Sequence, residues 1–221
     1  ASFASAFALA VTGSTAVFAA PTHDKAAGLV IYPKIAVDED AGIDTRLHLS
    51  NVSSTQQMAH CFYVNANSHC ANTGAVCTSF ADCEDTETGF FAPCEPGWIE
   101  TNFDIFFTAR QPIGWVASEG LAADDLPCRA TFLNPNPCLG GSNNGTRIPP
   151  ISENPFIGEL KCIQADDVTR LPVVCDGDDC RNDLTGHAAI TSATLGDVAS
   201  YPAAGLEAAR NNGDEELVIG G

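Results

Sequence analysis

The chain has 221 residues, enough for one domain with a sizeable hydrophobic core, or for one domain with appendages. Hydrophobic residues make up 45% of the chain and charged residues 17%, which excludes a disordered polyampholyte and a long charged helix. The 28 acidic residues against 10 Lys and Arg leave a net charge of −18, which repels a phosphate backbone and excludes nucleic acid as a partner.

The first segment, residues 1–20, contains no charged side chain and is rich in small residues. This composition predicts an export signal, with Val17 and Ala19, or Phe18 and Ala20, at the positions that a signal peptidase reads. The basic region that opens such a signal is missing, so we expect the sequence to start inside a longer reading frame. A membrane anchor is the alternative, but Ala, Ser, Thr and Gly are poor partners for lipid hydrocarbon. We therefore expect no membrane span in the mature chain.

From residue 28 onward, short apolar and β-branched runs alternate with Gly, Pro, Asn and Asp, which predicts strands rather than helices. The run 44–51 places Leu47 and Leu49 on one face and Arg46 and His48 on the other, as in a half-buried strand. The predicted strands are 28–38, 44–51, 58–65, 99–109, 156–165 and 184–193.

These strands predict an all-β fold, an antiparallel immunoglobulin-like β-sandwich over residues 28–194. Two insertions, 66–98 and 110–155, are far longer than ordinary hairpin loops. Further on, residues 203–210 predict a short helix. The apolar end of the 195–221 segment predicts the start of a truncated continuation.

The ten cysteines are numerous for a reduced cytosolic protein, and an even count favours disulfides, so we expect an extracellular or cell-surface location. Cys61 and Cys162 lie on predicted strands, and we expect them to bridge the two sheets as in immunoglobulin domains. The long insertions need cross-links of their own. The other disulfide candidates are Cys70, Cys77, Cys83 and Cys94 within the first insertion, Cys128 with Cys138, and Cys175 with Cys180.

Two patterns favour a metal instead. The dipeptides His60-Cys61 and His69-Cys70 offer soft ligands for zinc or copper, although the C-x-x-C spacing of a zinc knuckle is missing. Aspartates crowded in a Gly-containing loop are typical calcium ligands, and a solvated acidic loop is the alternative. The calcium candidates are Asp176, Asp178, Asp179 and Asp183.

Motifs of known catalytic chemistry are missing from the sequence: it has no G-x-S-x-G, H-E-x-x-H, P-loop or G-x-G-x-x-G. We therefore expect neither an enzyme nor a cofactor other than calcium. Trp98 and Trp115 lie in or beside predicted loops and are candidates for a carbohydrate platform. Trp115 is equally suited to the core of a sandwich.

Two stretches carry a resemblance. Within residues 28–64, a short acidic turn leads into a strand that fits D-T-x-[IL]-x-[LV]-[ST]-N from Asp44 to Asn51. The run CTSFADC, from Cys77 to Cys83, is similar to C-T-S-D-A-D-C turns, with Phe80 as the departure. On these residues the chain resembles exported bacterial surface proteins that have an immunoglobulin-like sandwich and cysteine-rich insertions. The resemblance implies location and fold, and no catalytic residue carries over.

The signal-like start, the strand pattern and the lack of a catalytic motif together predict an exported, non-catalytic structural or adhesive module. Its expected partners are other extracellular proteins or a second copy of the chain, which could join through strand edges. The alternative from another class is an extracellular module that binds carbohydrate or calcium.

Overall fold

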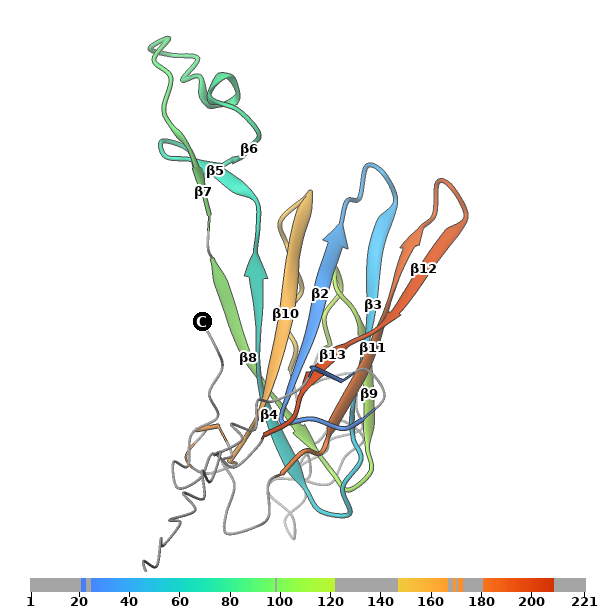
Figure 1. The fold of residues 1–221 in the computed structure, drawn as a ribbon. Helices are drawn as coiled ribbons and strands as arrows, with labels where there is room; N and C mark the ends of the chain where they lie inside the picture. The colour runs from blue at the N-terminus through green and yellow to red at the C-terminus, as the bar shows by residue number, and fades with distance from the viewer. Residues whose placement is uncertain are drawn as a thin grey trace, which may run out of the picture.

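The computed structural model of the protein describes residues 21–22, 25–97, 99–121, 147–166, 169, 171–172 and 181–208. Their regular structure is almost entirely β-strand, and helical structure among them is limited to a 3-10 turn, η1 (Phe80–Cys83). The strands pair antiparallel throughout (Figure 1). The predicted all-β antiparallel class is therefore confirmed.

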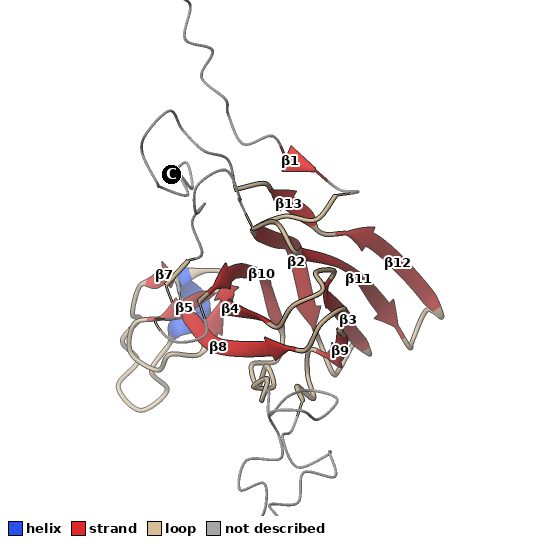
Figure 2. Ribbon diagram, turned by 90° about the horizontal axis from the view of Figure 1, so that it is seen from below, coloured by secondary structure: helices blue, strands red, loops and turns tan. Residues whose placement is uncertain are grey.

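Two sheets form the body of the fold (Figure 2). Sheet A has the strand order β1 (Pro21–Thr22), β13 (Ala204–Leu206), β2 (Leu29–Val37), β10 (Phe156–Ala165), β4 (Gln57–Asn65) and β8 (Glu100–Phe107). Sheet B has the order β12 (Asp197–Pro202), β11 (Leu184–Ser192), β3 (Ile43–Asn51) and β9 (Pro112–Val116). The six predicted strands are β2, β3, β4, β8, β10 and β11, and each boundary lies within two residues of its prediction.

The two sheets enclose one hydrophobic core, so the fold is a β-sandwich. Side chains alternate between the core and the outside along β3 and β8, as the sequence predicts: Phe103, Ile105 and Phe107 of β8 are buried, as are Leu47 and Leu49 of β3. Removal of this apolar surface from water is the main favourable contribution to folding.

The strand order differs from that of an immunoglobulin constant domain, in which the first strand lies beside the second and the sixth beside the seventh. Here the first long strand, β2, lies beside β10 in sheet A, while the second, β3, belongs to sheet B. The last long strand, β11, lies beside β3 and not beside β10, which precedes it in the sequence. The immunoglobulin-like part of the prediction is not confirmed. Alternation along a strand indicates which face is buried, but not which strand lies beside it.

Two predicted segments are wrong in detail. The insertion expected over 110–155 begins with a sandwich strand, β9. The sequence does not predict this strand because its five residues bury only Ile113 and Trp115, which is too short a run for a clear alternation. The short helix expected at 203–210 is instead the strand β13, and the largely exposed β12 precedes it.

The predicted signal at 1–20 and the continuation after residue 208 lie outside the described residues. Among the described residues, no helix has the length and apolar character that a membrane crossing requires.

Hydrogen bonds cross the core and link the two sheets. The Tyr32 hydroxyl on β2 donates to the His48 carbonyl on β3 over 2.6 Å, and the Trp115 indole on β9 donates to the Tyr63 hydroxyl on β4 over 2.7 Å. Burial raises the pKa of both tyrosines, so both hydroxyls stay protonated at neutral pH. These buried bonds have few alternative partners and fix how one sheet sits on the other.

A third link is the hydroxyl of Thr45 on β3, which accepts from the Ala36 amide over 2.9 Å and donates to the Ala36 carbonyl over 2.8 Å. We expect Thr45→Val to lower the free energy of unfolding by about 1 to 3 kcal/mol, because it leaves buried polar groups of Ala36 unpaired. Denaturant unfolding measures this loss. Thr45→Ser keeps the hydroxyl and should cost clearly less; equal costs for the two variants would contradict the assignment.

Candidate functional site

Residues 66–97, the described part of the first predicted insertion, form an arm that projects beyond one end of the sandwich (Figure 1). In the arm, β5 (Ser68–Cys70) pairs with β6 (Val76–Cys77) and β7 (Cys94–Pro96) to form a small third sheet. The arm continues the β4 and β8 pair, since β4 runs on into β5 and β7 returns to β8. This continuity of two neighbouring sandwich strands sets the direction of the arm.

Two disulfides brace the arm. Cys70 bonds to Cys83 and Cys77 to Cys94, and the sulfur atoms of Cys70, Cys77 and Cys83 lie within 4.8 Å of one another. Together with Ala92 they form a small buried cluster that takes the place of a hydrophobic core. The prediction that this insertion pairs within itself is confirmed. All four sulfurs are engaged in disulfides, so none is available as a thiolate ligand for a metal.

The third described disulfide joins Cys61 to Cys162, as predicted, but not between sheets. The two residues are register partners on the neighbouring strands β4 and β10 of sheet A, with their Cα atoms 4.1 Å apart. Such cross-strand neighbours lie close enough for a disulfide. Disulfides of this kind indicate an oxidising, non-cytoplasmic environment. The predicted pairs of Cys128 with Cys138 and of Cys175 with Cys180 lie outside the described residues.

A carboxylate at the root of the arm joins it to the sandwich. Glu153, in the segment before β10, accepts hydrogen bonds from Asn65 (2.9 Å), from Asn67 (2.5 Å) and from Nε2 of His69 (2.9 Å). Partial burial by itself raises the pKa of Glu153, but the bonds from His69, Asn65 and Asn67 outweigh that effect and lower the pKa. Gly97 lies against Nδ1 of His69, so close that a Cβ on residue 97 would come within 2.4 Å. The root of the arm is therefore a tightly packed polar cluster.

This cluster predicts a pH-dependent attachment of the arm. Because the pKa of Glu153 in the folded chain lies below its ordinary value of 4.5, the ionised carboxylate stabilises the root above that pH, and the stabilisation is lost as pH falls through the folded pKa. We expect the hydrogen-exchange protection of the Asn65 and Asn67 amides to fall on acidification below about pH 4.5. In Glu153→Gln this pH dependence should disappear. An unchanged dependence in that variant would assign it to another group.

The tip of the arm exposes three phenylalanines. Phe80, Phe90 and Phe91 are 57%, 77% and 42% exposed, and the rings of Phe80 and Phe91 stack with their centroids 5.3 Å apart. Exposed large apolar groups gathered in one place mark interaction surfaces. The arm has no Lys or Arg in its sequence. Its acidic residues are Asp82, Glu84, Asp85, Glu87 and Glu95.

Side-chain hydrogen bonds shape the loops that carry these rings. The Asp82 carboxylate accepts from the amide and hydroxyl of Thr78 and from the Ser79 amide, and the Asp85 carboxylate accepts from the Glu87 amide. These bonds favour the ionised form and lower the pKa of both carboxyls, those from Thr78 and Glu87 most. The tip is thus held by local bonds as well as by disulfides.

The other predicted sites are not brought together. Trp115 is 5% exposed in the sandwich core, so its assignment to a carbohydrate platform is wrong. Trp98 lies outside the described residues, as do Asp176, Asp178 and Asp179. The fourth calcium candidate, Asp183, accepts a hydrogen bond from the Gln164 side chain over 2.8 Å. Of the His-Cys dipeptides, His60 bonds Asp104 on β8 over 2.7 Å, and both cysteines are in disulfides.

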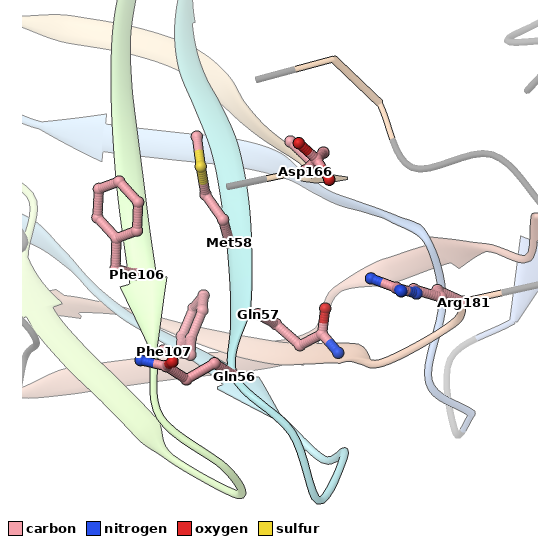
Figure 3. A pocket seen from close by; sticks show the side chains of 8 residues that line it. Gln56, Gln57, Met58, Phe106, Phe107, Asp166 and Arg181 are labelled. Carbon is pink, nitrogen blue, oxygen red and sulfur yellow. The ribbon is translucent and has the colours of Figure 1, made fainter. Parts of the chain in front are cut away.

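A small cavity lies on sheet A (Figure 3), where Gln57, Met58, Phe106, Asp166 and Arg181 contribute to its lining. Its volume of about 90 Å³ is well below the roughly 300 Å³ at which ligand sites begin. A shallow groove of about 360 Å³ runs along the irregular part of the β2 and β10 pair. None of the described residues that line it has an aromatic ring on which a sugar could stack.

Comparison of the chain with protein-family models, with curated proteins and with solved structures found no match. The fold and the disulfides thus define the class of protein: a disulfide-stabilised antiparallel β-sandwich with a projecting, cross-linked arm. The tip of that arm is its candidate functional site.

Proposed function

We propose that the protein is an exported, non-catalytic module that adheres to other extracellular proteins through the tip of its arm, residues 80–91. The observation that carries the proposal is the exposure of Phe80, Phe90 and Phe91 at the end of a disulfide-braced arm. Burying a Phe side chain contributes about 1.5 to 3 kcal/mol, and aromatic anchors on a rigid support lose little entropy on binding. A complex in which a partner covers this tip therefore keeps most of the free energy that burial of the phenylalanines contributes.

The charges around the tip favour a particular kind of partner. The carboxylates of Asp82, Glu84, Asp85 and Glu87 lie between Phe80 and Phe90 in the sequence, and no Lys or Arg of the arm offsets them. An apolar pocket with Lys or Arg at its rim complements such a surface. A second copy of the chain fits less well, because the net charge of −18 repels it.

A non-catalytic role is supported by how the histidines of β4 and β5 are used. His60 bonds Asp104 and His69 bonds Glu153, and in the described residues neither is hydrogen-bonded to a Ser, Thr or Cys side chain. A nucleophile activated by a histidine base needs such a bond.

The alternative mode of assembly uses a strand edge. Among the described strands, β12 lies at the edge of sheet B and pairs with β11 alone, and its Val198 is 65% exposed. An open edge of this kind accepts an added strand. Val198 therefore serves as the comparison position for the experiment below.

A photo-crosslinking amino acid at Phe90, or at Val198, in the chain made and exported by its own cell distinguishes the two modes. We expect crosslinks from position 90 to a distinct extracellular protein, and none from position 198. Adducts from position 198 to a second copy would favour assembly through β12. No protein adduct from position 90 would overturn the proposal.

A further inference from the structure

His48 and His187 lie side by side on the outer face of sheet B. They are register partners on β3 and β11, and their rings stack with centroids 4.5 Å apart and an angle of 9° between the ring planes. Both side chains are exposed. The fold thus creates a surface pair of imidazoles from residues that are distant in the sequence.

The neighbouring strands leave room for this pair. The residue opposite His48 on β9 is Gly114, and the residue opposite His187 on β12 is Pro202. A Cβ on Gly114 would lie 2.8 Å from atoms of the His48 ring, so the glycine makes space for the imidazole. Neither neighbour carries a polar side chain that could engage the ring nitrogens.

The pair also lacks the carboxylate partner that the histidines of β4 and β5 have. Within the described part of the chain, no hydrogen bond engages a ring nitrogen of His48 or His187. Partial burial, the nearby His187 and the charge of Arg46 all lower the pKa of His48. A lowered pKa favours the neutral ring, in which one nitrogen carries a lone pair that a metal can bind.

We propose that His48 and His187 form a two-histidine site for a divalent transition metal ion of the zinc and copper class. Imidazole nitrogen is the common protein ligand of these ions, with bonds of about 2.0 to 2.1 Å, and rotation of the two rings directs one nitrogen of each to a single ion. Two protein ligands leave positions for water or for a donor from a bound molecule. Arg46, two residues before His48 on the same face, favours an anionic donor there.

Titration calorimetry of the full, tag-free chain with Zn²⁺ and with Cu²⁺ at pH 7, in excess Mg²⁺ to occupy carboxylates, tests the site. We expect saturable binding that His48→Ala and His187→Ala each weaken about tenfold or more, because chelation by two linked ligands is lost. His60→Ala is the matched control and should bind as the parent chain does. In NMR spectra, Zn²⁺ should shift the ring protons of His48 and His187 and leave those of His60 and His69 in place.

Several results would overturn this site. Affinity that is unchanged in both His48→Ala and His187→Ala would do so, as would Zn²⁺ shifts confined to other residues. If Zn²⁺ or Cu²⁺ gives heat without Mg²⁺ but none in excess Mg²⁺, the ions are attracted to the acidic surface in general and not to the histidine pair. Circular dichroism of each variant confirms that a lost signal reflects the site and not the fold.

Discussion

Replacing Cys61 and Cys162 together with alanine should lower the free energy of unfolding by about 4 kcal/mol. The disulfide joins residues 101 positions apart. A cross-link that closes a loop of roughly 100 residues lowers the entropy of the unfolded chain, which stabilises the folded state by about 4.7 kcal/mol. It also holds β4 against β10, and both cysteines are fully buried. Denaturant unfolding followed by far-UV circular dichroism measures the change.

The matched control removes the Cys70 to Cys83 disulfide of the arm, which spans 13 positions. That arm lies outside the sandwich core, so its loosening is a local event and should move the unfolding of the sandwich by less than about 0.5 kcal/mol. A comparable loss from both double variants would mean that arm and sandwich unfold as one unit.

Substituting Phe80, Phe90 and Phe91 together with serine should weaken binding of the crosslinked partner about 100-fold or more, while the free energy of unfolding stays nearly unchanged. A factor of 100 corresponds to about 2.8 kcal/mol, less than the burial of two phenylalanines contributes. The three side chains are exposed, so their loss removes little from the folded chain itself. Surface plasmon resonance with the purified partner gives the affinities.

Leu195 and Val198, 75% and 65% exposed on the β11 and β12 hairpin, provide the control for apolar exposure as such. Changing both to serine should leave the affinity within about twofold, because surface residues outside an interface contribute little. Similar losses from the two sets of variants would argue for unspecific hydrophobic adsorption.

Most of the sandwich could be predicted from the sequence because its long strands alternate clearly. On β3 every second residue from Thr45 is buried, and on β8 every second residue from Phe103. Such patterns identify a strand and its buried face without any knowledge of its neighbours. By contrast, β12 is mostly exposed and shows no pattern of this kind, so the sequence does not predict this strand and indicates only a short helix over 203–210.

The relations between strands could not be predicted in this way. Cys61 and Cys162 were correctly paired, yet their shared sheet depends on β4 and β10 being neighbours. The same holds for the stack of His48 on His187, which exists only because β3 and β11 lie side by side. The sequence leaves Trp115 open between a loop platform and the core, because an aromatic residue after Pro and Gly has the local signature of a loop. Pairing of its strand with β3 decides for the core.

Hydrogen exchange of the full chain, alone and with the crosslinked partner, tests most directly whether the tip of the arm is the contact surface. We expect the partner to slow amide exchange in residues 80–91 and to leave exchange in β12 unchanged. Protection of β12 without protection of residues 80–91 would contradict the assignment and place the contact on the edge of sheet B.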